Sequence, residues 1–298
     1  MIRQDEATCL RMVEAGRTNT YPELVARLLR EGRRDEALQW IYRGIQETEE
    51  TAPGIADELR TILRETWERE GDWPAVTAVC AEAFFYEPTY PAFRDLEEAA
   101  RRAAVRDEVR EAAMRYLISG ERPPAGGGVI SGVLPDTGVG VRAPRRGITA
   151  PGADTLIEIA IAEEKPDEVL RWYDQWEEVK IDRYLRYNLE DRVADAVADA
   201  HPELAIAIWR KKAERLITEV RPRSYEGSLQ YLRKLRSNTE TPEWEEYLGE
   251  LRHKHARKRR FLEVLDHAED QQIVEGYPID HTLEAQVSWC PRSGDVEG

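Results

Sequence analysis

Apolar residues recur at intervals of three and four positions through residues 21–120. Leu24 and Leu28 show this spacing, and so do Leu59 and Leu63. Side chains at these intervals lie on one face of an α-helix, whereas a half-buried strand requires strict alternation. The pattern therefore predicts a series of amphipathic helices, each with one buried face.

Short polar breaks interrupt the apolar pattern at residues 31–35, 51–54, 70–72 and 87–89. Each break contains glycine or proline, the residues that most often end or begin a helix. Connections of this length join helices that pack side by side in opposite directions. The sequence therefore predicts antiparallel helical hairpins.

Two of these breaks resemble each other and indicate an internal repeat. Gly32 and Gly71 lie 39 residues apart, and each follows one helical stretch and precedes the acidic start of the next, at Asp35 and Asp72. A fixed period of this order is the signature of stacked helical hairpins.

The second helix of each copy resembles the second helix of a tetratricopeptide repeat. In the second copy the small, small and proline positions are Val76, Ala83 and Pro88, and in the first copy they are Ala37, Gly44 and Glu49. Small residues at these places allow a neighbouring helix to approach closely. Because a glutamate replaces the proline in the first copy, the likeness extends to the class of repeat and no further.

A change in composition divides the chain into two predicted blocks. Residues 120–152 are rich in Gly and Pro and have no helical period, which predicts a flexible linker. It separates an N-terminal helical-repeat block, residues 1–119, from a C-terminal one, residues 153–270. Residues 271–298 again lack an apolar period and are expected to form a flexible tail. The predicted fold class is all-α: an α-solenoid of antiparallel, tetratricopeptide-like hairpins in two blocks.

Aromatic residues gather in one part of the second block. They are Trp172, Tyr173, Trp176, Tyr184 and Tyr187. On a helical hairpin such side chains either pack between repeats or line a groove that binds a protein partner. We take these five residues as the candidate protein-binding site, with core packing as the alternative for most of them.

The last helix of the second block is expected to run from Thr241 to about Asp266, because Thr and Pro242 favour a helix start. This helix carries the one dense basic run of the sequence. Its permanent cations are Arg252, Lys254, Arg257, Lys258, Arg259 and Arg260. Such a run can bind the phosphates of nucleic acid. Alternatively, it forms a solvated face that neutralises acidic side chains such as Glu250 and Glu263.

The composition indicates a folded and highly charged protein. Hydrophobic residues make up 41% of the chain and charged residues 34%, with a formal net charge of -15. That charge repels nucleic acid at long range, so binding it requires a local basic patch. No stretch approaches the ~18 apolar residues of a membrane span, and the first residues lack the apolar region of a signal peptide. We therefore expect no membrane association.

Candidate catalytic and metal-binding patterns are missing from the sequence. Cys9, Cys80 and Cys290 lie far apart and form no CxxC pair, which argues against a disulfide framework or a zinc site and favours a reducing cytoplasm. Neither a nucleophile elbow nor a P-loop occurs. Residues 134–138 match the pentapeptide that sortases cleave, but no hydrophobic span and basic tail follow, which favours an ordinary loop. We expect no enzyme activity, no metal and no cofactor.

Two long phrases, residues 157–174 and 244–266, resemble the helical C-terminal region of prokaryotic SWIM zinc-finger proteins, and residues 134–138 look similar too. The likeness covers about residues 21–266 and implies a helical region that holds partners. Such proteins carry an N-terminal zinc finger of the form CxCx(n)CxH, which serves nucleic-acid or protein contacts. This chain has no Cys-x-Cys pair, so the zinc site is not implied for it.

The sequence thus predicts a non-enzymatic protein-interaction scaffold built on helical repeats, whose protein partner it does not identify. The alternative is a nucleic-acid-associated protein that binds phosphates through the basic helix 252–260. Binding to phosphates would weaken steeply with salt, which distinguishes the two hypotheses.

Overall fold

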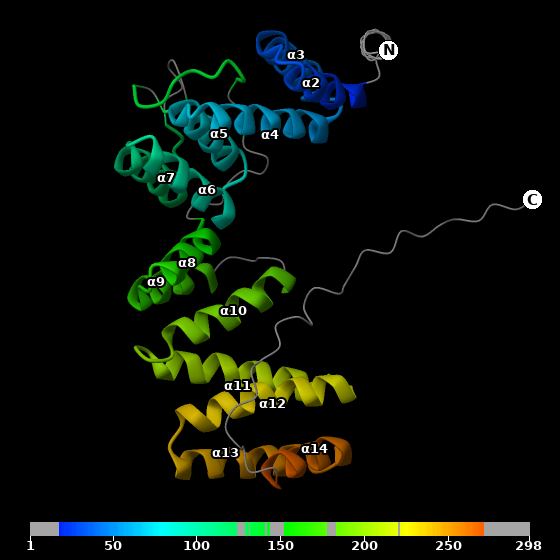
Figure 1. Ribbon diagram of the computed structural model, residues 1–298. Helices are drawn as coiled ribbons and strands as arrows, with labels where there is room; N and C mark the ends of the chain where they lie inside the picture. The colour runs from blue at the N-terminus through cyan, green and yellow to red at the C-terminus, as the bar shows by residue number, and fades with distance from the viewer. Residues whose placement is uncertain are drawn as a thin grey trace, which may run out of the picture. The chain divides into compact units, whose positions relative to one another are not determined.

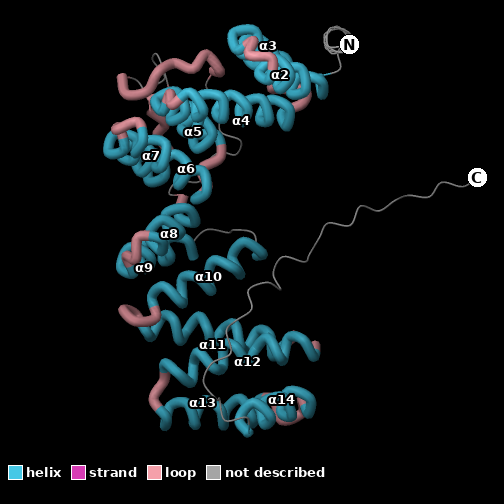
Figure 2. Tube along the Cα trace, in the orientation of Figure 1, coloured by secondary structure: helices cyan, strands magenta, loops and turns pink. Residues whose placement is uncertain are grey.

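The computed structural model describes residues 18–123, 129–130, 132–140, 142–143, 152–177, 183–219 and 221–270. Within these ranges the chain forms 13 α-helices and one short 3₁₀ helix, and no strand occurs (Figures 1 and 2). The all-α class that the apolar spacing predicts is confirmed.

The chain divides into two compact units, Met1–His201 and Pro202–Gly298. The first unit contains η1 (Thr18–Thr20), α2 (Tyr21–Arg30), α3 (Arg34–Thr48), α4 (Pro53–Glu70), α5 (Trp73–Tyr86), α6 (Tyr90–Arg102), α7 (Arg106–Ser119), α8 (Ala153–Ala162), α9 (Pro166–Glu177) and α10 (Arg183–Val197). The second unit contains α11 (Pro202–Thr218), α12 (Pro222–Asn238), α13 (Thr241–Lys254) and α14 (Arg259–Asp270). In the first unit, helices that follow each other in sequence pack together, and α2 also contacts α4, as α8 contacts α6 and α10.

Helix starts in the first unit agree with the local sequence signals. The carboxylate of Asp72 accepts a hydrogen bond from a backbone N–H in the first turn of α5, and the hydroxyl of Thr89 does the same for α6. Each of these helices has a proline at its second residue, where the missing N–H costs no hydrogen bond. The predicted breaks before α5 and α6 are therefore confirmed.

Four hairpins of the first unit share one turn. In α2–α3, α4–α5, α6–α7 and α8–α9 the first helix is followed by a residue with positive φ, namely Gly32 (76°), Gly71 (76°), Ala104 (59°) and Glu164 (54°). The next backbone N–H donates to the carbonyl five positions earlier, at 2.9 to 3.0 Å. This is the Schellman motif, whose left-handed residue is usually glycine. The sequence indicates the first two turns by their glycines, and the phrase Glu163-Glu164-Lys165-Pro166 indicates the fourth. It misses only the turn at Ala104, which neither Gly nor Pro marks.

Gly44 in α3 allows close helix packing, as predicted for a small residue at this position. A β-carbon there would lie 2.5 Å from Leu59 Cδ1 of α4 and 2.9 Å from Tyr21 Cδ1 of α2. Both neighbours are fully buried, so they have no free space to move into. A larger side chain at this position would push three helices apart.

The described parts of residues 120–152, which the sequence predicts to be a flexible linker, pack against the first unit. Val129, Ile130 and Leu134 are buried there. The glycine and proline content correctly predicts a segment without regular secondary structure. It does not predict that these three apolar side chains are buried, because they do not follow a helical or strand period.

The helices after this segment belong to the first unit, so the division between units falls after His201 rather than within residues 120–152. The hydroxyl of Thr155 in α8 donates to the carbonyl of Pro88 at 2.7 Å. Arg110 of α7 pairs with Glu163, just after α8, at 2.6 Å. These contacts join α8 to the helices before the segment.

The single long helix predicted for residues 241–266 is wrong, because the chain turns at residues 255–258 and forms α13 and α14. His255 is buried in this turn, and its ring centroid lies 5.8 Å from that of Phe261. The turn allows Phe261 and Leu265 to be buried where α14 contacts α12. Neither Gly nor Pro marks the turn, so local sequence gives no signal for it.

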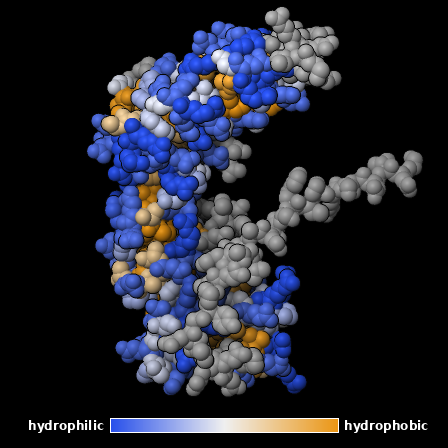
Figure 3. Space-filling model, viewed as in Figure 1, coloured by the Kyte–Doolittle hydropathy of each residue, from blue (hydrophilic) through white to orange (hydrophobic). Residues whose placement is uncertain are grey.

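Hydrophilic residues dominate the face of the protein seen in Figure 3. In the described part of the chain, no helix combines the length and apolar character that a membrane span needs. The predicted tail, residues 271–298, lies outside the described residues.

Candidate functional site

The aromatic residues predicted to bind a protein partner are placed in the packing of α9. Trp172, Tyr173 and Trp176 are only 5%, 2% and 1% exposed, and the rings of Tyr173 and Trp176 lie 5.7 Å apart. Tyr184 and Tyr187 belong to α10, and their side chains lie outside the described part of the structure. The three described side chains therefore present almost no surface to a partner, which favours core packing for them.

The basic run 252–260 is divided between the end of α13, the turn and the start of α14, so it is not the continuous basic helix predicted from the sequence. Four of its six permanent cations have partners within the second unit, at 2.5 to 3.1 Å. The pairs are Arg252 with Asp266, Lys254 with Glu214, Lys258 with the Ile217 carbonyl, and Arg260 with Glu263. Arg257 and Arg259 are exposed and have no partner among the described residues. This pairing favours the neutralised, solvated face over a phosphate-binding surface.

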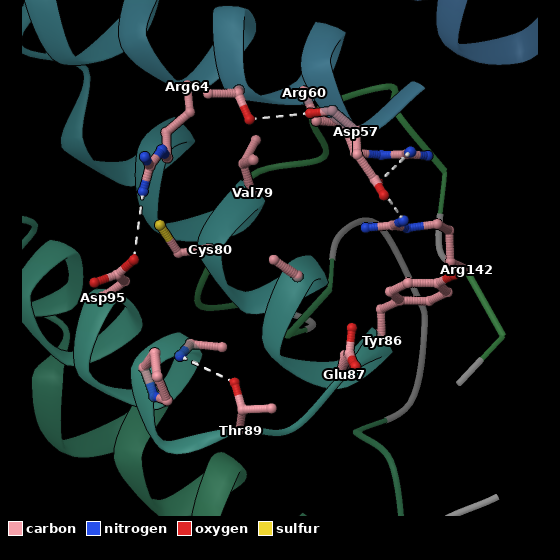
Figure 4. Close-up of a pocket in the computed structure, with 14 residues that line it drawn as sticks. Asp57, Arg60, Arg64, Val79, Cys80, Tyr86, Glu87, Thr89, Asp95 and Arg142 are labelled. Atoms are coloured by element: carbon pink, nitrogen blue, oxygen red, sulfur yellow. Dashed lines mark hydrogen bonds and ion pairs between the residues drawn. The ribbon is translucent and has the colours of Figure 1, made fainter. Parts of the chain in front are cut away.

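A groove lies between α4, α5 and α6 in the first unit. It consists of two adjoining clefts of about 380 Å³ and about 190 Å³ that share Arg64, Cys80 and Asp95. We call it the α4–α6 groove. It follows α5 from Trp73 at one end to Tyr86 at the other, a length of about 20 Å at the helical rise per residue. Figure 4 shows the larger of the two clefts.

Small side chains on one face of α5 form the floor of the groove. They are Val76, Val79, Cys80 and Ala83, which recur at the three- and four-residue spacing of one helix face. Val76 and Ala83 are also the small positions of the predicted repeat. The small residues that the sequence predicts for close helix packing therefore also leave space beside α5. Ala83 is exposed in this space.

Charged side chains of α4 and α6 form the walls. On α4 they include Asp57, Arg60 and Arg64, and on α6 they include Asp95, Glu98 and Arg102. Each set recurs at three or four positions, so its members point to the same side of their helix. A groove with an apolar floor and walls of both signs suits a peptide with apolar and charged side chains.

Each end of the groove is closed by an arginine stacked on an aromatic ring. The guanidinium of Arg142 lies 3.7 Å from the ring centroid of Tyr86, and that of Arg102 lies 4.4 Å from the ring centroid of Trp73. Such cation–π contacts hold a flat guanidinium against the face of the ring.

Arg64 stands at the middle of the groove with its side chain 32% exposed. Its nitrogen atoms lie 3.7 Å from carboxylate oxygens of Glu68 and Asp95, which is longer than a hydrogen bond (Figure 4). The forked guanidinium therefore has donors that a carboxylate of a ligand can use.

Among the residues of the groove floor, Cys80 alone has a side chain that can act as a nucleophile. Burial raises the pKa of its thiol to about 11, so it is protonated at neutral pH. A protonated thiol is a poor nucleophile. Cys80 therefore contributes to the apolar floor. The other two cysteines lie outside the described residues.

A loop covers the end of the groove near Tyr86. We define this strap as residues 129–143, of which 131 and 141 lie outside the described residues. Its backbone turns where the carboxylate of Asp136 accepts a hydrogen bond from the N–H of Gly138 at 2.9 Å. Arg122 donates a hydrogen bond to the carbonyl of Arg142.

A buried carboxyl group, Glu82 of α5, lies close to the strap. The residue is 6% exposed, and its Oε2 atom has no hydrogen-bond partner. Burial raises the pKa of Glu82 to about 7, although the positive charges of Arg122, Arg60 and Arg142 act in the opposite direction. Arg142 and Asp136 of the strap therefore lie within electrostatic range of a buried carboxyl group.

The described residues contain no group of three His, Cys, Asp or Glu side chains arranged to hold a metal ion. The α4–α6 groove was not predicted from the sequence. The small positions Val76 and Ala83 were the available signal, but the residues that meet them come from α4, α6 and the strap and are distant in sequence.

The fold and the groove define an all-helical protein with a cleft suited to binding. No protein-family model matches the chain, and comparison with curated proteins and with solved structures gives no significant match. The likeness to the helical region of SWIM zinc-finger proteins therefore stays a prediction.

Proposed function

We propose that the protein is a non-enzymatic interaction scaffold of the cytoplasm and that a protein partner binds in its α4–α6 groove. In this proposal the hairpins are tetratricopeptide-like repeats of an α-solenoid, an architecture whose grooves commonly bind other proteins. The observation that carries the proposal is the groove itself: a long cleft with a small apolar floor, charged walls and no activated nucleophile.

The repeated turn supports the solenoid part of the proposal. Four successive hairpins end their first helix with the same Schellman motif, at residues 32, 71, 104 and 164. Identical turns give successive hairpins similar internal geometry, which is what stacking of repeats requires.

The size of the groove limits what it can hold. A length of about 20 Å fits an extended peptide of roughly six residues, at about 3.3 Å per residue, or a helix of about 13 residues. The apolar floor favours small or aliphatic side chains, and Arg64 at the middle favours an acidic side chain next to them.

Filling the floor of the groove tests the proposal. Ala83→Trp places a large ring in the larger cleft, whereas Ala26→Trp places the same ring on the exposed side of α2 as a matched control. A partner captured from the source cells, purified and titrated against each variant, is expected to bind Ala83→Trp at least tenfold more weakly than the wild type. The control is expected to bind like the wild type, with thermal unfolding showing that both variants fold. Equal binding by the wild type and Ala83→Trp would contradict the proposal.

Binding of nucleic acid through residues 252–260 is the weaker proposal, because four of the six cations have protein partners. It predicts an affinity that falls steeply with salt and that drops on reversing the charges of Arg257 and Arg259. If the captured partners disappear on nuclease treatment, this weaker proposal replaces the groove.

A further inference from the structure

One end of the α4–α6 groove is occupied by a side chain of the strap. The guanidinium of Arg142 lies 3.7 Å from the ring centroid of Tyr86, and its Nη1 atom lies 2.7 Å from Asp57 Oδ1 (Figure 4). Its Nε atom lies 4.0 Å from a carboxylate oxygen of Glu49. The side chain is only 10% exposed although it belongs to a loop.

The groups that hold Arg142 match the chemistry of arginine. An aromatic face contacts the flat side of the guanidinium, and the carboxylate of Asp57 accepts a hydrogen bond from its edge. The Glu49 carboxylate adds a longer-range ion pair with Nε, which has no hydrogen-bond partner. A lysine ammonium could pair with the same carboxylates but lacks the planar surface that stacks on the ring.

These groups belong to the helical hairpins and not to the strap. Asp57 lies in α4, Tyr86 at the end of α5, and Glu49 directly after α3. Glu49 and Asp57 are also positioned by Arg60, whose side chain is 6% exposed. The helices and their own ion pairs therefore define the site, and the strap supplies only the arginine in it.

We propose that Asp57, Glu49 and Tyr86 form an arginine-recognition site for an extended peptide of a partner protein, and that Arg142 of the strap is its built-in competitor. The inference rests on the proposed function, since it assumes that the groove holds a peptide, and it adds the side chain that this end of the groove selects. The partner presents its arginine where Arg142 now lies, with the preceding residues along the groove.

The charge of the protein agrees with this occupant. The net charge of -15 attracts a basic peptide at long range, and Glu87 adds a further carboxylate to the lining at this end of the groove. A peptide with an acidic side chain at the Tyr86 end would be repelled both by the net charge and by the carboxylates there. A peptide with a cation at that end is attracted by both.

Tethering makes the strap an effective competitor. A segment linked to its own site acts at an effective concentration of the order of mM, so a peptide that binds weakly is excluded until its concentration or its further contacts overcome the strap. The strap therefore sets a threshold that selects for partners with contacts beyond the arginine.

A peptide added in trans tests the inference. The probe is a fluorescent synthetic peptide with the sequence of residues 129–143, and its control carries Arg142→Ala. Both are titrated by fluorescence anisotropy against three full-length proteins: the wild type, a variant whose residues 129–143 are replaced by a Gly/Ser segment of equal length, and the single variant Arg142→Ala. The single variant keeps the test decisive where the replacement does not fold.

The expected result is that the probe binds the replaced or Arg142→Ala chain at least tenfold more tightly than the wild type. The control peptide is expected to bind at least tenfold more weakly than the probe. In the same background, Asp57→Asn is expected to lower the affinity at least tenfold, whereas Glu58→Gln, an exposed neighbour on α4, leaves it unchanged.

Equal affinity for the probe and its Arg142→Ala control overturns the arginine site while leaving the groove as a peptide-binding surface. No binding to either variant also overturns it, whereas the proposed function stands or falls separately with Ala83→Trp and the purified partner.

Discussion

Replacing Ala104 by glycine is expected to stabilise the first unit, although it removes a methyl group. Ala104 is exposed in the turn between α6 and α7 and has a φ of 59°. The left-handed conformation costs a residue with a β-carbon roughly 1–2 kcal/mol, and glycine avoids that cost. Glycine also increases the conformational freedom of the unfolded chain, which offsets roughly 0.4–1 kcal/mol. The net expectation is a gain of about 0.5–1 kcal/mol.

Scanning calorimetry measures this gain. For a unit of this size, 1 kcal/mol corresponds to roughly 2–4 °C in Tm, so the transition should rise by about 1–4 °C. The matched control is Ala26→Gly, at an exposed helical position of the same unit, which should lower the same transition because glycine costs about 1 kcal/mol in a helix. If Ala104→Gly lowers Tm as the control does, the explanation of the repeated turn is refuted.

Three further substitutions test other parts of the account. Gly44→Val should destabilise the first unit by about 1–3 kcal/mol in urea unfolding, since its side chain would overlap two buried neighbours; an unchanged midpoint would contradict the close packing. Thr155→Val removes the buried hydroxyl that donates to the carbonyl of Pro88 and should lower the free energy of unfolding by about 1–3 kcal/mol. Thr61→Val, at an exposed position of α4, should change it little. Equal effects of the two substitutions would show that the Thr155 hydroxyl does not stabilise the fold. Glu82→Gln should leave stability near that of the wild type at pH 4.5 and exceed it above pH 7. The pKa of Glu82 in the folded protein, about 7, lies above its ordinary value of 4.5. The wild type alone therefore loses stability as the pH rises from 4.5 to 7, by at most roughly 3 kcal/mol. Parallel pH profiles of the two proteins would contradict the burial of Glu82.

Local signals in the sequence predicted the helices of the first unit well. Glycine and proline punctuation located the turns near Gly32 and Gly71, because these residues act on the backbone directly. The equivalent turn at Ala104 could not be predicted in this way, since an ordinary residue there is held in the left-handed region by the packing of the helices on either side.

The candidate site could not be predicted from local signals. Asp57 and Arg142 lie 85 residues apart, and no periodic pattern connects them. The conspicuous aromatic residues, such as Trp172 and Trp176, are buried, because large aromatic side chains contribute most to stability when they are removed from water. The proposed binding surface lies instead where α5 carries small residues, and small residues are not conspicuous in a sequence.

Hydroxyl-radical footprinting of the complex with the purified partner tests the central claim most directly, because it reports the exposure of individual side chains. Trp73 and Tyr86, the partly exposed aromatic residues at the two ends of the groove, are predicted to become less reactive when the partner binds. Protection confined to residues 252–260, with Trp73 and Tyr86 unchanged, would contradict the account.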